Sequence, residues 1–210
     1  YIDGKNLARV ISEMGFQNTD YRRSARWMKA VADAVHHAHQ HGVLHRDIKP
    51  ANILIDQSDQ PHMTDFGLAK RSTVVPSPDP TGPASAASHS PRPARHSELT
   101  LSGQVLGSPS YLSPEQAEGR RSAVGVASDV YSIGAVLYHL LTGRPPFQGE
   151  TFTALLRQVI ETDPVPPRRL NPSIPRDLET ICLACLEKEP SRRFAEARQL
   201  GDELGRFLAN

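Results

Sequence analysis

Apolar residues recur along much of the chain at spacings of three and four, the pattern of helices that bury one face. Glycine follows the first two of these stripes, at Gly15 and Gly42, and glycine is the residue that most often ends a helix. The stripes predict five helices, over residues 7–14, 27–38, 152–160, 178–186 and 200–208.

A sixth segment, residues 129–141, is apolar on nearly all sides and predicts a helix that is buried all round. Strand signals are fewer. Residues 53–55 are apolar, a polar stretch follows, and a second short run surrounds Met63, which together predict one small hairpin. We therefore expect an α+β fold that is mainly helical, with a minor sheet.

Residues 72–98 differ in composition from the rest of the chain. They contain six Pro and six Ser but no Phe, Trp or Tyr. Such a segment cannot bury enough apolar surface to offset the entropy lost on ordering. We interpret it as a disordered insert inside one domain that spans residues 1–210, because the motifs on its two sides belong together.

The overall composition excludes several classes of protein. With 24 Lys and Arg against 23 Asp and Glu, the net charge is +1, which argues against nucleic-acid binding through bulk basicity. The longest apolar run, from Ile133 to Tyr138, is far shorter than the roughly 20 residues of a membrane span. Two cysteines exclude a disulfide framework and fit a reducing compartment, so we expect a cytoplasmic location.

Residues 45–52, His-Arg-Asp-Ile-Lys-Pro-Ala-Asn, lie between a predicted helix and the hairpin, where a loop can present side chains. Asp47 can accept a hydroxyl proton, and Asn52 can bind Mg²⁺ through its amide oxygen. Lys49 places a compact positive charge beside both. Asp65, which follows the hairpin, offers a second hard oxygen ligand.

These residues resemble the motifs of the protein kinase family, in particular the Ser/Thr kinases of bacteria. Residues 45–52 match the catalytic loop, Asp65-Phe66-Gly67 the metal-binding motif, and Ser113-Pro114-Glu115 the end of the activation segment. The match extends over nearly the whole chain, from a hinge at Tyr1 to the last helix. It implies the hinge and carboxyl-terminal lobe of a Ser/Thr protein kinase, with the predicted hairpin beside the catalytic loop.

The resemblance also implies a reaction and the residues that carry it. The γ-phosphoryl group of ATP would pass to Ser or Thr hydroxyls of protein substrates, with Mg²⁺ as cofactor. Asp47 would act as the base, Lys49 would stabilise the transferred group, and Asn52 and Asp65 would hold the metal. The adenine would rest on Leu54 and bond the backbone of Ile2.

Other positions carry structural or regulatory roles by the same resemblance. Arg46 would bind a phosphate on the activation segment, for which Thr100 and Ser102 are the candidate acceptors. Ser108 stands where the family usually has Thr, and its hydroxyl would bridge Lys49 and Asp47. The resemblance further implies that His45 packs on Phe66, Glu115 forms an ion pair with Arg193, and Asp129 anchors the catalytic loop.

The chain begins with Tyr1 instead of Met, which suggests an amino-terminal truncation. In the family, the glycine-rich phosphate loop and the strand Lys that binds ATP come before the hinge. We therefore expect the 210 residues alone to have negligible kinase activity. A dimer for phosphorylation between two copies is left open.

Two other functions compete with an active protein kinase, and two residue clusters suggest a metal or redox site. A pseudokinase-like scaffold would keep the fold and bind partners without catalysis, and a small-molecule phosphotransferase would lack the segment 108–115. The histidines at 36, 37, 39, 41 and 45 suggest a metal cluster, but helix periodicity points His36, His37 and His39 in different directions. Cys182 and Cys185 fall on a helical stripe, which favours core packing over a redox or zinc site.

Overall fold

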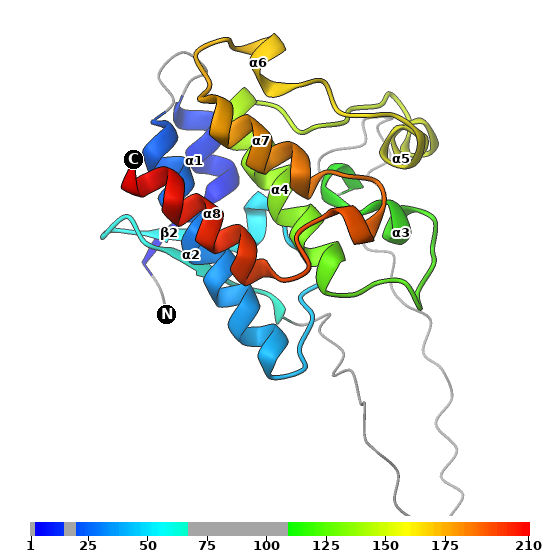
Figure 1. The fold of residues 1–210 in the computed structure, drawn as a ribbon, viewed down its shortest axis with the longest axis horizontal. Helices are drawn as coiled ribbons and strands as arrows, with labels where there is room; N and C mark the ends of the chain where they lie inside the picture. The colour runs from blue at the N-terminus through cyan, green and yellow to red at the C-terminus, as the bar shows by residue number, and fades with distance from the viewer. Residues whose placement is uncertain (1–2, 15–19, 67–108) are drawn as a thin grey trace, which may run out of the picture.

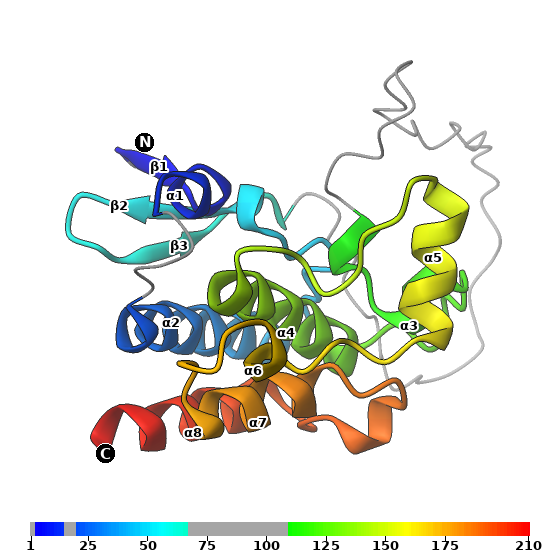
Figure 2. The same ribbon diagram turned by 90° about the horizontal axis from the view of Figure 1, so that it is seen from above.

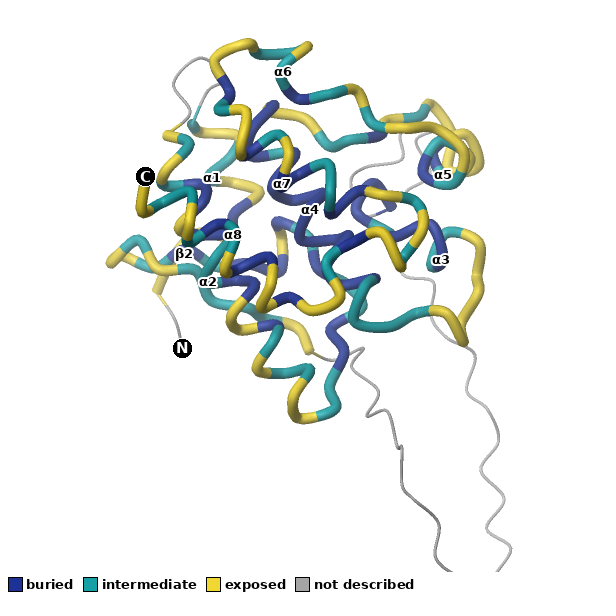
Figure 3. The backbone as a smooth tube through the Cα atoms, in the orientation of Figure 1, coloured by how far each residue is buried: buried dark blue, intermediate teal, exposed yellow. Residues whose placement is uncertain are grey.

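The computed structural model describes residues 3–14, 20–66 and 109–210, and its centre is helix α4 (Val126–Thr142) (Figure 1). Nearly every residue of α4 is buried, as the apolar pattern predicts, and the dark-blue tube at the centre of Figure 3 shows it. Helices α2 (Tyr21–Gln40) and α7 (Arg176–Cys185) pack against it. Helix α8 (Ala197–Ala209) lies along α2 and forms the outer layer in Figure 2.

Helix α2 begins six residues before its predicted start. The side chain of Asp20 accepts a hydrogen bond from the backbone N–H of Arg23 at 2.9 Å, which caps the helix and makes this turn stable although it is polar. The carboxyl end is closer to expectation. Helix α2 ends at Gln40, and Gly42 follows in the left-handed conformation with φ 72°.

The small sheet has three antiparallel strands in the order β1-β2-β3. The predicted hairpin is confirmed as β2 (Ile53–Asp56) and β3 (Pro61–Met63). Strand β1 (Gly4–Asn6) was not predicted, because its three residues are exposed and show no alternation of apolar and polar positions. It approaches β2 so closely that a Cβ on Gly4 would lie 2.3 Å from the carbonyl oxygen of Ile55, so only glycine fits.

The remaining predicted helices are confirmed as α1 (Leu7–Met14), α5 (Phe152–Glu161), α7 and α8. Short helices that the periodicity did not predict complete the described chain. They are η1 (Pro50–Asn52), η3 (Pro109–Tyr111), α3 (Pro114–Ala117), α6 (Pro167–Leu170) and η4 (Pro190–Arg192). Each begins with proline, whose fixed φ suits the first position of a helix but gives no apolar period. The mainly helical α+β fold is thus as predicted.

Two further sequence predictions concern the insert at residues 72–98 and the absence of a membrane span. The proposed disordered insert at 72–98 lies outside the described residues. Across residues 3–14, 20–66 and 109–210, every helix is too short or too polar to cross a membrane.

Candidate active site

The structure brings three of the predicted catalytic residues together on the loop between α2 and β2. The Nζ of Lys49 lies 2.9 Å from Oδ2 of Asp47. The amide nitrogen of Asn52 donates to the backbone oxygen of Asp47 at 2.8 Å and to its carboxylate at 3.1 Å. Helix η1 (Pro50–Asn52) sets these distances, because its turn brings the side chain of Asn52 back beside Asp47. The Asn52 amide oxygen, the atom that a hard cation binds, takes no part in that contact.

Asp65 is held next to this loop by its neighbour in sequence. The backbone N–H of Thr64 donates to the backbone oxygen of Asn52 at 2.9 Å. Asp65 itself is exposed and has φ 59°, and Arg46 has φ 67°. Positive φ is uncommon for residues other than glycine and often occurs at functional sites. Asn52 and Asp65, whose side-chain oxygens are the candidate metal ligands, therefore lie on adjoining segments.

His45 connects the catalytic loop to the segment that holds Asp65. One ring nitrogen, Nε2, lies 3.0 Å from the carbonyl oxygen of Thr64, and the other, Nδ1, lies 3.3 Å from the N–H of Asp47. A carbonyl can only accept, so the proton belongs on Nε2 and Nδ1 accepts. The ring packs on Phe66 with centroids 4.7 Å apart, which is the contact expected from the sequence.

Asp129 anchors the catalytic loop to the central helix, as the resemblance implied. Its carboxylate is 1% exposed and accepts the backbone N–H groups of His45 at 2.9 Å and Arg46 at 2.8 Å. The third contact, 2.7 Å from Nε2 of His39, was missed. A signal for it exists: His39 lies four residues after the buried Val35, on the inward face of α2.

Replacing His39 with Leu is expected to lower the free energy of unfolding by about 1–3 kcal/mol. The leucine keeps the side-chain volume but removes a donor to a carboxylate that is almost completely buried. Urea unfolding followed by circular dichroism measures the effect. His37→Leu is the matched control, because His37 is exposed two residues away. Equal urea midpoints for the two variants would contradict the assigned role of His39.

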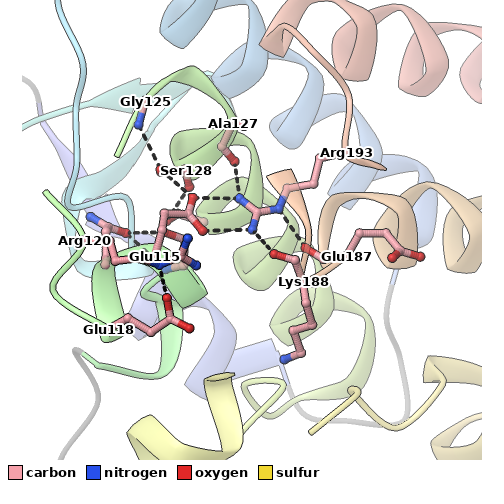
Figure 4. Close-up of polar contacts among 12 residues, drawn as sticks. Glu115, Glu118, Arg120, Gly125, Ala127, Ser128, Glu187, Lys188 and Arg193 are labelled. Atoms are coloured by element: carbon pink, nitrogen blue, oxygen red, sulfur yellow. Dashed lines mark hydrogen bonds and ion pairs between the residues drawn. The ribbon is translucent and has the colours of Figure 1, made fainter. Parts of the chain in front are cut away.

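The predicted ion pair between Glu115 and Arg193 is confirmed, and both side chains are completely buried (Figure 4). Two guanidinium nitrogens of Arg193 donate to the two carboxylate oxygens of Glu115, at 2.8 and 2.9 Å. Burial raises the pKa of Glu115, but hydrogen bonds from Arg193 and Ser128 outweigh it and hold the pKa below its ordinary value. Arg193 also donates to three backbone oxygens, so no guanidinium nitrogen is left without a partner.

Helix α3, which carries Glu115, is also bonded to the catalytic loop. The side-chain amide of Gln116 donates to the backbone oxygen of Arg46 at 2.8 Å. The Nε of Arg46 is buried and has no hydrogen-bond partner within the described segments. A buried guanidinium N–H without a partner is costly, so this atom is a candidate contact for an anion.

The other site residues predicted from the sequence fall into two groups. Leu54 lies on β2 between Ile53 and Ile55, which face the core, so its half-buried side chain faces the opposite side of the sheet. Five lie outside the described residues: Ile2, Gly67, Thr100, Ser102 and Ser108.

Cys182 and Cys185 are buried in the core against α4, as expected from their helical stripe. The thiol of Cys182 lies 3.6 Å from the backbone oxygen of Gly134. Burial raises the pKa of both thiols, which keeps them protonated and unreactive.

This mainly helical fold, with an Asp-Lys-Asn loop joined to a second acidic segment, agrees with what comparison with known proteins finds. The chain belongs to the protein kinase domain family, whose sequence description matches residues 1–203. It is 35% identical, over its whole length, to a probable serine/threonine-protein kinase of Clostridium acetobutylicum. It is also 35% identical over 97% of its length to the serine/threonine-protein kinase PknB of Mycolicibacterium smegmatis, and 34% over 98% to PknB of Mycobacterium tuberculosis.

The chain spans less than a third of these relatives, 28% of the clostridial protein and 29% of each mycobacterial one. The similarity covers the lobe that holds the candidate site. It therefore shows the family to which the chain belongs.

Proposed function

We propose that the protein containing this chain is a Ser/Thr protein kinase, which transfers the γ-phosphoryl group of ATP to hydroxyl groups of protein substrates. The observation that carries the proposal is the cluster of Asp47, Lys49 and Asn52, joined through Thr64 to the segment of Asp65. Relatives that are about a third identical over the same lobe are named as serine/threonine kinases.

Each side chain of the cluster has a distinct task in this proposal. Asp47 orients the substrate hydroxyl and accepts its proton as the oxygen attacks phosphorus. Lys49, held 2.9 Å from Asp47, places its charge where the transferred group becomes more negative. The hydrogen bonds from Asn52 fix the rotamer of Asp47, so the base is in position before the substrate arrives.

The donor set of the site fits magnesium. The amide oxygen of Asn52 and the carboxylate of Asp65 are hard oxygen ligands on adjoining segments, and Mg²⁺ prefers such ligands together with phosphate oxygens. When bound, Mg²⁺ with ATP supplies the phosphoryl group and neutralises its charge. The left-handed backbone at Asp65 supports this role, because positive φ in residues other than glycine occurs mainly at functional sites.

A phosphate on the activation segment is proposed to bind Arg46. The support is the buried Nε of Arg46, which lacks a partner among the described residues, and the hydrogen bond that the Gln116 side chain donates to the backbone oxygen of Arg46. Thr100 and Ser102 remain the proposed acceptors. Phosphopeptide mapping of the active protein checks this, and phosphate found only elsewhere would contradict it.

The test of the function is a transfer assay with ATP, Mg²⁺ and mixed protein acceptors, followed by phosphoamino-acid analysis. The natural gene product that contains these 210 residues is expected to yield phosphoserine and phosphothreonine. Magnesium binding without any transfer would support the scaffold alternative, and label that is found only on tyrosine would refute the Ser/Thr assignment.

The 210-residue chain assayed by itself is expected to show no transfer above background. In the family, the phosphate loop and the strand Lys that bind ATP precede the part that this chain resembles. The same assay, with chain and gene product at equal concentration, measures the difference. Transfer by the chain alone that disappears in Asp47→Asn would overturn this expectation while leaving the proposed function intact.

A further inference from the structure

The run of histidines at the end of α2 divides into residues with different surroundings. His39 is bonded to Asp129 in the interior, and Nδ1 of His36 lies 4.0 Å from the carboxylate of Glu196. His37 and His41 are both exposed. Within the described segments neither of them contacts a carboxylate, so the two imidazoles are available to a ligand from solution.

His37 lies in the last turn of α2, and His41, four positions on, caps the helix, so the two rings come together on one side of this end. Their ring centroids are 4.4 Å apart, with an angle of 46° between the planes. With a metal–nitrogen distance of about 2.0–2.1 Å, two imidazoles bound at a right angle have centroids about 4.5 Å apart. At the tetrahedral angle the separation rises to about 5.2 Å. The observed spacing matches the right angle.

A hydrogen bond also prepares one of the rings for a metal. Nδ1 of His41 lies 2.8 Å from the backbone oxygen of His37. Because the carbonyl can only accept, Nδ1 donates, and the lone pair of the neutral ring is then on Nε2. Metal-binding histidines usually have their second nitrogen held in this way, by a carbonyl or a carboxylate.

We propose that His37 and His41 form a binding site for a transition-metal ion of the Cu²⁺ or Ni²⁺ class. Such ions favour imidazole and adjacent ligands at right angles, whereas Zn²⁺ favours the tetrahedral angle. The position at the carboxyl end of α2 adds to this, because the helix dipole favours positive charge there. The described residues hold no group of three metal-binding side chains, so water completes the coordination and the ion exchanges readily.

This site is distinct from the proposed magnesium site in both chemistry and place. It offers nitrogen ligands on the exposed face of α2, while Asn52 and Asp65 offer oxygen beside the catalytic loop. It therefore does not depend on the proposed kinase activity, and its test needs no ATP.

The test is titration of the 210-residue chain with Cu²⁺, followed by calorimetry and electron paramagnetic resonance. His37→Gln and His41→Gln are each expected to weaken the tightest site at least about tenfold and to remove the signature of two coordinated imidazoles. His62→Gln is the matched control, because His62 is half-buried and already bonded to Asp56. His89 and His96 are retained in all variants, so any Cu²⁺ that they bind is the same in each and cancels when the variants are compared.

A second readout is the effect of Ni²⁺ on thermal unfolding. An ion that binds only the folded turn raises the melting temperature, and the His37→Gln/His41→Gln double variant is expected to lose this increase while His62→Gln keeps it. Equal Cu²⁺ affinity and equal spectra in all variants would overturn the proposal. A site that prefers Zn²⁺ to Cu²⁺ would overturn the right-angle geometry on which the choice of metal rests.

Discussion

Replacing Arg193 with Met lowers the free energy of unfolding by about 3–5 kcal/mol, because the carboxylate of Glu115 is then completely buried without its partner. For a chain of this size the loss corresponds to a decrease in melting temperature of about 6–20 °C. Three backbone oxygens that accept from Arg193 lose their donor in the same variant, which adds to the effect. Differential scanning calorimetry of the 210-residue chain measures the change.

The control for this variant is Arg157→Met, which breaks an ion pair with Glu161 that is largely exposed. Its effect is expected within about 0.5 kcal/mol, because exposed pairs contribute little. A double-mutant cycle with Glu115→Gln adds a second check. If Arg193→Met and Glu115→Gln are additive, the two side chains do not interact energetically and the prediction is wrong.

The same pair predicts how stability depends on pH. The pKa of Glu115 is lower in the folded chain than its ordinary value of 4.5. The pair therefore stabilises the fold fully above that value, and the contribution is lost as the pH falls below it. The difference between wild type and Arg193→Met should narrow from pH 6 to pH 3.

Replacing Asp47 with Asn is expected to reduce phosphotransfer by the natural gene product by about 10²–10⁴-fold. Asn keeps the shape of the side chain, and the amide cannot accept the hydroxyl proton. The charge that lies 2.9 Å from Lys49 is also removed. The kcat for a protein acceptor measures the loss, and the KM for ATP is expected to change much less, because the role proposed for Asp47 is to act on the hydroxyl.

The matched control is Asp177→Asn, an exposed carboxylate in the first turn of α7. It is expected to keep wild-type kcat. Circular dichroism and melting temperature establish that Asp47→Asn still folds. A folded Asp47→Asn variant with wild-type kcat would show that Asp47 is not the base.

Much of the fold can be predicted from the spacing of apolar residues, because the packing in the structure agrees with that spacing. The apolar stripes place α1, α5, α7 and α8 within a few residues of their ends, since each helix buries one face against the core. Strand β1 could not be found in this way. Its residues are exposed, and it exists through backbone pairing with β2, whose residues lie 48 to 52 positions away.

The candidate site, too, could be predicted only where its residues lie close together in the sequence. Asp47, Lys49 and Asn52 could be predicted because they lie within one short loop, and its turn alone brings them together. Asp129 and Arg193 came only from resemblance to a family. His39 was hidden among neighbouring histidines, and its role becomes visible when α4 places a buried carboxylate beside it.

The anchoring of the catalytic loop by α4 has a consequence for the order in which the protein is made. The loop residue His45 and its anchor Asp129 are 84 positions apart, and Glu115 and Arg193 are 78 apart. On a ribosome that synthesises the amino end first, Asp47 is present long before the groups that hold its loop have emerged. The growing chain carries the residues of the candidate site unsupported, and these contacts are complete only after Arg193 has been synthesised.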